Sequence, residues 1–255
     1  MQELKTRCSI KGKIAEIFHS IQGEGIYTGI PQIFVRFYGC NLNCKFCDTK
    51  LTHSATQQNA GSSSVSMVSG VEPLTKFDKY SMLKLFEVLS GFKEKFHSVC
   101  FTGAEPLLQK EFLKGTLILI KQKGITTYLE TNGTLPDELS QVIDYTDIVA
   151  MDWKLSSSTG LQDFSKQHIE FLKIALEKEV FIKMVICNST EITDLKKSVE
   201  SISKVNKEIP LVLQPNYFEL DEELVNKLKS YQQICRKHLG DVRIMPQMHK
   251  LLKIR

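Results

Sequence analysis

The chain lacks any long hydrophobic run. Its most apolar windows have the length of a strand, such as residues 180–186, whereas a helix that spans a bilayer needs about 20 apolar residues. Residues 1–12 are charged and polar and contain no apolar core of a secretory signal. We therefore expect a cytoplasmic protein without a membrane partner, whose 7 cysteines, an odd number, lie in a reducing compartment.

A strong excess of one charge is also missing. The 33 basic and 29 acidic residues give a net charge of +4, and they are spread along the chain without an arginine-rich stripe. A nucleic-acid-binding surface needs such a concentration of positive charge. We expect no nucleic-acid partner, and the charge balance suits a small anionic substrate.

The hydrophobic pattern predicts an α/β fold. Short β-branched and apolar runs alternate with longer segments of helical period, which is typical of a mostly parallel sheet with crossover helices. At 255 residues and 42% hydrophobic content, one domain over residues 1–255 is simpler than two small ones. The expected strands are 32–37, 98–102, 126–131, 147–152, 180–186 and 209–214, with a further pair at 13–18 and 242–244. The expected helices are 81–96, 107–123, 162–178, 191–204 and 221–238.

Polar or glycine-bearing turns follow each of the six main strands. They comprise the loop after residue 37 and residues 103–106, 132–134, 153–156, 187–190 and 215–217. Ligands of parallel α/β folds bind at the carboxyl ends of the strands, so we expect these turns to form one rim around a site. Residues 52–69 are polar and without periodicity, and we interpret them as an insertion after the first of these loops.

Cys40, Cys44 and Cys47 form a C-x₃-C-x₂-C cluster directly after an apolar run. Three thiolates on one loop can hold a metal centre. A [4Fe–4S] cluster held by three cysteines leaves one iron without a protein sulfur, and a small chelating molecule can occupy it. We place the chemistry at that open iron.

Two other interpretations of the cysteine loop remain. A structural zinc site usually takes two ligand pairs, and no second pair of the C-x₂-C or H-x₃-H type follows, although His53 could complete a Cys₃His set. The three cysteines could also be unrelated buried thiols. The other four, Cys8, Cys100, Cys187 and Cys235, lie apart from one another, and we expect none of them to be a ligand.

The cysteine spacing, Phe46 just before the last cysteine and the Gly-x-Glu-Pro turn at 103–106 together resemble the radical S-adenosylmethionine (SAM) superfamily. The resemblance implies a partial, open (β/α)₆-type barrel with modified helix content. It also implies that the cofactor chelates the open iron, takes one electron and releases a 5′-deoxyadenosyl radical that abstracts hydrogen. The electron would come from a flavodoxin- or ferredoxin-like donor.

Five segments narrow the resemblance to the 7-carboxy-7-deazaguanine synthase family: residues 20–25, 47–49, 102–109, 130–133 and 246–250. The similarity runs from about residue 14 to 250 and leaves out the insertion. It implies a carbon–nitrogen lyase of queuosine and 7-deazapurine biosynthesis, a tRNA modification pathway. Such an enzyme converts 6-carboxy-5,6,7,8-tetrahydropterin to 7-carboxy-7-deazaguanine with loss of ammonia, using SAM, a [4Fe–4S] cluster and Mg²⁺. The resemblance further implies a homodimer.

The same resemblance implies roles for single residues. The pterin substrate would contact Ile21, Gln22, Gly23, Glu24, Arg36, Thr102 and Gln247, with Arg36 holding its carboxylate through a two-pronged contact. The competing interpretation of Arg36 is a structural salt bridge to a neighbouring acid. Nearby His249 is expected to pack or to lie at the surface. Thr49 would hold Mg²⁺, unless it is a plain turn threonine.

SAM would contact three sets of residues: Phe46, Cys47 and Asp48; Gly103, Ala104 and Glu105; and Lys154, Leu155, Ser156, Gln214, Pro215, Asn216 and Tyr217. Ala104 departs from the family pattern, which has a second glycine there. A Cβ atom disfavours positive φ and crowds whatever packs on the backbone, so this departure bears modestly on how the cofactor fits, although the carbonyl acceptors of the turn are kept. No catalytic side chain is expected beyond the cluster and the cofactor radical.

Two rival functions are kept. A glycyl-radical activase of the same superfamily must admit a protein loop, whereas the turn at 22–25 with Arg36 suits a small ligand. A non-enzymatic iron–sulfur or zinc protein would show no spectral change with SAM, because it has no open iron.

Overall fold

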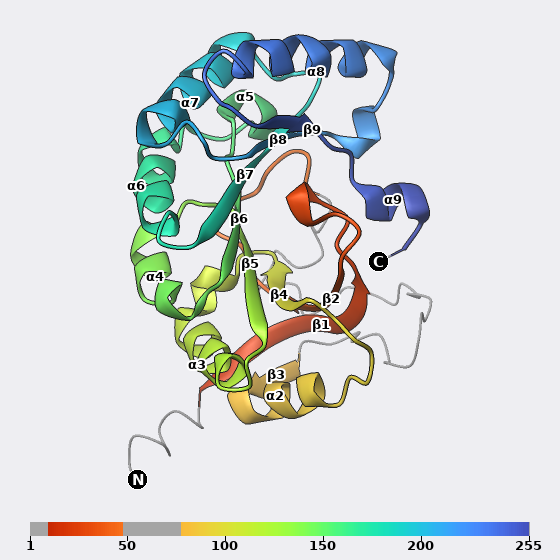
Figure 1. Ribbon diagram of the computed structural model, residues 1–255, viewed down its shortest axis with the longest axis vertical. Coiled ribbons are helices and arrows are strands. Elements are labelled where there is room, and N and C mark those ends of the chain that lie inside the picture. The colour runs from red at the N-terminus through yellow and green to blue at the C-terminus, as the bar shows by residue number, and fades with distance from the viewer. Residues whose placement is uncertain (1–9, 48–77, 255) are drawn as a thin grey trace.

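A nine-stranded sheet forms the centre of the computed structural model, which describes residues 10–47 and 78–254 (Figure 1). The strand order is β3-β1-β2-β4-β5-β6-β7-β8-β9. All neighbours from β2 to β9 are parallel, and β1 is antiparallel to both β2 and β3. The strands are β1 (Lys11–Ile21), β2 (Pro31–Phe37), β3 (Asp78–Ser81), β4 (Ser98–Gly103), β5 (Thr126–Thr131), β6 (Ile148–Asp152), β7 (Glu179–Ile186), β8 (Leu211–Pro215) and β9 (Val242–Ile244).

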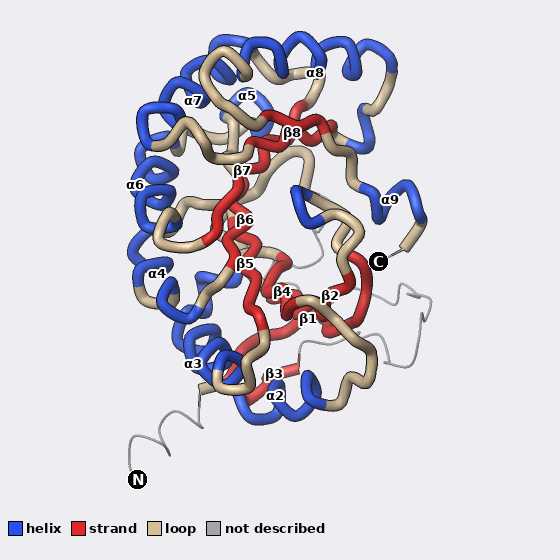
Figure 2. Tube along the Cα trace, viewed as in Figure 1, coloured by secondary structure: helices blue, strands red, loops and turns tan. Residues whose placement is uncertain are grey.

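The sheet curves but does not close, because β3 and β9 stand at its two ends and do not pair with each other. The helices cover its outer side, and the strands face inward (Figure 2). This confirms the expected α/β fold with a mostly parallel sheet in a partial, open barrel. The helices are α2 (Met82–Ser90), α3 (Lys110–Lys121), α4 (Pro136–Ser140), α5 (Ser156–Thr159), α6 (Ser165–Ala175), α7 (Ile192–Val205), α8 (Glu222–Cys235) and α9 (Met248–Leu252), with short 3₁₀ turns η1 (Gly25–Tyr27), η3 (Pro106–Gln109), η4 (Ile143–Tyr145) and η5 (Tyr217–Glu219).

Alternating side chains of each strand serve two apolar layers. On β4, Val99 and Phe101 belong to the layer under the helices, whereas Cys100 between them faces the interior of the barrel. The interior layer is completed by residues such as Tyr128 and Phe181 and fills the barrel below the carboxyl ends of the strands. Period-two alternation therefore gives the inner side of the sheet its own apolar layer, and the polar side chains described below lie at the ends of the strands.

The eight predicted strands and five predicted helices are all present, and their ends differ by a few residues. The helix expected at 81–96 ends at Ser90, since Gly91 forms its C-cap. The helix expected from 107 is a 3₁₀ turn to Gln109, followed by α3, because Pro106 stands at the first position of that turn. Strand β3 and the short helices α4, α5 and α9 were not predicted. The insertion at 52–69 lies outside the described residues, and none of the described helices is long and apolar enough to cross a membrane.

Candidate active site

A cavity opens at the carboxyl ends of the strands. Five of the six expected turns contribute to its lining, which confirms the predicted rim. The fifth turn, residues 187–190, does not; β7 reaches the cavity through Lys183 and Val185 instead. Of the predicted site residues, the lining contains Ile21, Gln22, Gly23, Glu24, Arg36, Cys40, Cys44, Phe46, Cys47, Thr102, Gly103, Ala104, Lys154, Gln214, Pro215, Asn216 and Gln247.

The three loop cysteines all line this cavity. A cluster takes each thiolate at a separate iron. Burial raises the pKa of Cys44 and raises that of Cys40 to about 11, so bound iron would be needed to keep these thiols ionised.

The loop is fixed from outside by the chain near α5. Lys45 donates its backbone N–H to the carbonyl of Thr159, at 3.0 Å, and Leu42 and Cys44 pack against Phe164. Three of the remaining cysteines, Cys100, Cys187 and Cys235, are buried elsewhere. Cys8, His53, Asp48 and Thr49 lie outside the described residues.

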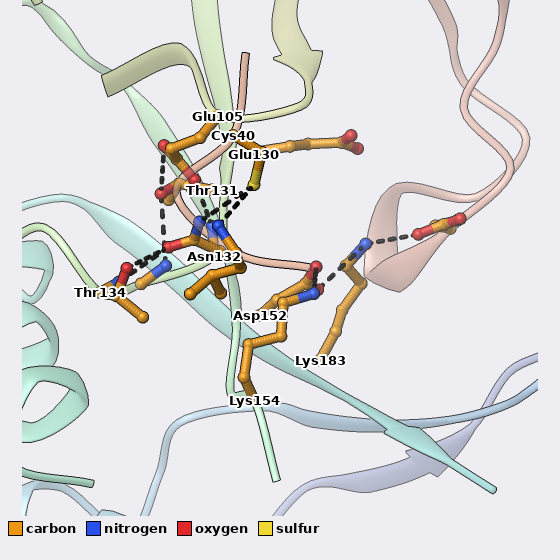
Figure 3. Close-up of polar contacts among 12 residues, drawn as sticks. Cys40, Glu105, Glu130, Thr131, Asn132, Thr134, Asp152, Lys154 and Lys183 are labelled. Carbon is orange, nitrogen blue, oxygen red and sulfur yellow. Dashed lines mark hydrogen bonds and ion pairs between the residues drawn. The ribbon is translucent and has the colours of Figure 1, made fainter. Parts of the chain in front are cut away.

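Asn132 connects the cysteine loop to the end of β5 (Figure 3). Its Nδ2 donates to Asn41 Oδ1 at 2.8 Å and lies 3.9 Å from Cys40 Sγ, and its Oδ1 accepts from the backbone N–H and hydroxyl of Thr134. Asn132 also donates its backbone N–H to Glu105 Oε2 at 2.8 Å. These contacts leave the amide one orientation, with its N–H groups toward the cysteine loop.

Glu105 was predicted to contact SAM, but its side chain is fully buried and does not line the cavity. Its carboxylate accepts from the backbone of Leu107, from Thr131 Oγ1 and from Asn132. Burial raises its pKa to about 7, against the lowering effect of these three hydrogen bonds. The structure thus gives Glu105 the task of holding two neighbouring turns together.

The backbone of the turn at 103–106 shows which of its positions is sensitive to a Cβ atom. The positive φ of this turn, +100°, belongs to Gly103, where an added Cβ would lie 2.5 Å from Arg36 Cγ and 2.7 Å from the backbone of Phe37. Ala104 is not among the described residues with positive φ. The Cβ of Ala104 therefore does not strain the backbone of the turn, since the strain-sensitive position is Gly103.

Gln22, buried in the turn after β1, organises the far side of the cavity. Its Nε2 donates to Gln32 Oε1 at 3.0 Å and to Glu130 Oε1 at 2.9 Å, and its Oε1 accepts the backbone N–H of Glu24. Thr102 donates its hydroxyl to the other oxygen of Glu130. Burial, together with the nearby charge of Glu24, raises the pKa of Glu130, while Lys183 and the two hydrogen bonds lower it.

A row of alternating charges crosses the cavity. Lys154 Nζ lies 2.8 Å from Asp152 Oδ2, and Lys183 Nζ lies 3.3 Å from Asp152 Oδ1 and also pairs with Glu24 (Figure 3). Gln247 Nε2 then donates to Glu24 Oε1 at 2.7 Å. Burial works against the charge on Glu24, but Lys183 and Gln247 lower its pKa to about 2. Glu24 is therefore ionised, whereas the pKa of Glu130 is shifted in the opposite direction.

Arg36 lies at the edge of the cavity and forms an ion pair with Glu16, the acid on the neighbouring strand. The structural salt bridge that competed with the substrate role is thus present. Nε of Arg36 is nevertheless buried and has no hydrogen-bond partner in the described part of the chain. The ion pair with Glu16 engages Nη1 only, so other N–H donors of the guanidinium, Nε among them, remain for a ligand.

Three further residues predicted to contact SAM do not line the cavity. Leu155 is buried behind it, Ser156 Oγ donates to Asp194 at 3.1 Å, and Tyr217 does not line it, whereas the next residue, Phe218, does. His249, expected to pack or to lie at the surface, both packs against Gly23 and lines the cavity.

Sequence reasoning assigned no role to Glu130, Asn132, Asp152 and Lys183, which all line the cavity. The signal for Lys183 was present, since it is a charged residue in a strand whose inner residues are otherwise apolar. Asp152 is likewise the polar end of an apolar strand. Nothing in the sequence, however, indicated that these two side chains meet.

The chain resembles known proteins along almost all of its length. Residues 34–168 match the model of the radical SAM superfamily. It is 33% identical to 7-carboxy-7-deazaguanine synthase of Geobacter sulfurreducens, over 94% of this chain and 96% of that protein. It is also 33% identical to the enzyme of the same name from Methanocaldococcus jannaschii, over 94% and 98%.

Solved structures agree with these similarities. The crystal structure of QueE from Escherichia coli superposes with a TM-score of 0.68 at 25% identity and covers 98% of this chain and 99% of that one. A structure of TYW1 with a lysine-pyruvate adduct bound superposes with a TM-score of 0.51 at 16% identity, over 82% and 74% of the chains, which shows a shared fold alone.

Proposed function

The chain belongs to the radical SAM superfamily and, within it, to the 7-carboxy-7-deazaguanine synthase family, and from this premise we propose that it converts 6-carboxy-5,6,7,8-tetrahydropterin to 7-carboxy-7-deazaguanine with loss of ammonia. The step belongs to queuosine and 7-deazapurine biosynthesis. The observation that carries the proposal is that one cavity joins the three-cysteine loop to Arg36, Glu24 and Glu130. A cluster site and a polar site for a small anionic ring therefore share one space.

Cys40, Cys44 and Cys47 would hold the [4Fe–4S] cluster. When bound, the cluster and SAM supply a carbon radical that removes a hydrogen atom from the substrate. The residues that would bind and orient SAM, and so form the cofactor half, are Phe46, Gly103, Ala104, Lys154, Gln214, Pro215 and Asn216, and all of them line the cavity. Oε1 of Gln214 is buried and lacks a hydrogen-bond partner among the described residues, so it offers an acceptor to the cofactor.

The other half of the cavity would bind the pterin. Nε of Arg36 is available for the substrate carboxylate, and ionised Glu24 offers an acceptor to ring N–H groups. Ile21, Gly23, Thr102, Gln247 and His249 also line the cavity, and we assign them to this substrate half. Glu130 has a raised pKa and neutral hydrogen-bond donors, so it can hold a proton beside the substrate. We assign it the proton that departing ammonia requires.

Further features of the proposal concern metal, partners and organisation. Thr49 is assigned to Mg²⁺, because a hydroxyl is a hard ligand that suits an ion that keeps several waters. A Thr49→Ala variant should lose the dependence of turnover on Mg²⁺, and unaltered dependence would reject this ligand.

The family resemblance supports a homodimer, a cytoplasmic location and a flavodoxin- or ferredoxin-like electron donor. The single continuous sheet supports one domain over residues 1–255.

Anaerobic reconstitution tests the function directly. Electron paramagnetic resonance (EPR) of the reduced protein should change when SAM is added, and the pterin should yield 7-carboxy-7-deazaguanine and ammonia. Cys44→Ala should lose the cluster, whereas Cys100→Ala, which changes a buried cysteine outside the loop, should keep it. A cluster indifferent to SAM would favour an electron carrier, and SAM cleavage that ignores the pterin would favour another radical enzyme such as a glycyl-radical activase.

A further inference from the structure

Lys183 stands between the two halves of the cavity. It lies on β7 with its side chain 6% exposed, and its ammonium group contacts two carboxylates, Glu24 and Asp152. Asp152 belongs to the cofactor half, because its other oxygen pairs with Lys154, whose Nζ lies 5.4 Å from the centroid of the Phe46 ring. Glu24 belongs to the substrate half, where it also accepts from Gln247.

These contacts depend on one another because Lys183 is buried and its three charged neighbours, Asp152, Glu24 and Lys154, are half-buried. A buried charge needs a partner of opposite sign, and removing one member of such a pair is strongly destabilising. Lys154 pairs with Asp152 and also lies over the Phe46 ring in the cofactor half. Lys183 pairs with both Asp152 and Glu24. A change of partner at Lys154 therefore alters how strongly Lys183 is held by Glu24.

We propose that Lys183 is a positioning residue that couples cofactor binding to substrate binding, an inference that rests on the proposed function. SAM carries a carboxylate, and an anion beside Lys154 draws that lysine away from Asp152. Asp152 then holds Lys183 more tightly, and Glu24 is released to accept hydrogen bonds from the pterin. Coupling of this kind is reciprocal, so the pterin must strengthen SAM binding by the same factor.

The test is the affinity for 6-carboxytetrahydropterin, measured by anaerobic calorimetry with and without SAM. The reconstituted enzyme is kept oxidised so that no turnover occurs. In the wild type we expect SAM to lower the pterin Kd by about fivefold or more, the lower end of typical coupling. Lys183→Met should bring the ratio of the two Kd values to about one, and Lys183→Arg, which keeps the charge, should retain part of it.

Lys121→Met is the matched control, because Lys121 also pairs with an aspartate, Asp147, but neither residue lines the cavity. It should keep the wild-type ratio. A wild-type ratio of one, or an unchanged ratio in Lys183→Met at equal iron content, would overturn the inference. If Lys183→Met does not fold, Asp152→Asn carries the test: a ratio that falls toward one supports the coupling, and an unchanged ratio overturns it.

The failure of the proposed function would look different. A wild-type enzyme that binds SAM but neither binds nor converts the pterin contradicts the function itself, and the coupling with it. An enzyme that makes the product with independent affinities contradicts the coupling alone.

Discussion

Arg36 and Glu16 face each other across the antiparallel strands β1 and β2, and their side chains form an ion pair at the edge of the cavity. The guanidinium carbon also lies 5.4 Å from the centroid of the Phe18 ring. These two contacts fix the plane of the guanidinium while Nε stays without a partner among the described residues. Arg36 is thus oriented by the protein and still has a donor for a carboxylate.

Arg36→Lys should raise the KM for the pterin while iron content stays unchanged. A lysine cannot reproduce a two-pronged contact, and a hydrogen bond to a charged group contributes about 1.5–3 kcal/mol, so we expect a rise of about 10- to 100-fold. Steady-state kinetics with an iron assay measure both quantities. Arg243→Lys, at an exposed ion pair with Asp241, is the control. An unchanged KM in Arg36→Lys would reject the carboxylate contact.

Gly103→Ala should weaken SAM binding much more than Ala104→Gly, although each change adds or removes one methyl group in the same turn. At Gly103 a Cβ meets Arg36 and the backbone of Phe37 at a φ of +100°, and we expect SAM binding to weaken at least tenfold. Ala104→Gly should change SAM affinity by less than threefold and cost about 0.5–1 kcal/mol of stability through backbone entropy. Equilibrium titration with SAM and urea unfolding measure these effects. Equal losses of affinity would contradict the assignment of strain to Gly103.

Asn132→Asp should lower the reduction potential of the cluster. The amide directs an N–H group at Cys40 Sγ, 3.9 Å away, and hydrogen bonds to cluster sulfurs favour the more negative, reduced state. A carboxylate of the same shape removes that donor and adds negative charge. A redox titration followed by EPR measures the shift.

Thr134→Val is the control for Asn132→Asp. It removes a hydroxyl that contacts Asn132 and Asn41 but no sulfur, so it should move the potential less. Equal potentials in the wild type and Asn132→Asp, at equal iron content, would show that the amide does not act on the cluster.

The strands and the rim could be predicted because their causes are local. An apolar run such as that of β7 must be buried, and its polar end must lie where parallel strands finish. Strand β3 has no such signal: its four residues, DKYS, pair only with β1 at the edge of the sheet. The short helices α4, α5 and α9 have five residues or fewer and thus too few turns to show a period.

The interior of the site could not be predicted, because its contacts join distant parts of the chain. Lys183 and Glu24 are 159 positions apart, and Gln247 and Glu24 are 223 apart. The orientation of the Glu105 side chain could not be predicted either. Its place in a turn at the rim suggested a ligand contact, but only the packed structure reveals that the side chain turns inward to Thr131 and Asn132.

His168 makes the stability of the fold depend on pH. Its ring is buried against Trp153, with centroids 4.8 Å apart, and its Nε2 lies 3.2 Å from the carbonyl oxygen of Asn132. Burial, with the charge of Lys154, lowers its pKa to about 4, although the contact with Asn132 opposes this. The unfolded chain binds a proton near pH 6.5, so His168 contributes stability above that pH and loses it as the pH falls toward 4.

His168→Gln should remove this pH dependence, because glutamine places an amide N–H near the position of Nε2 and does not titrate. Between pH 7.5 and 5.5 the wild type should lose about 1 kcal/mol more unfolding free energy than the variant. Urea unfolding of the reconstituted protein at both pH values measures the difference. His238→Gln, at a half-buried histidine after α8, is the control and should follow the wild type. Parallel losses in the wild type and His168→Gln would mean that the buried ring is not the group that must stay neutral.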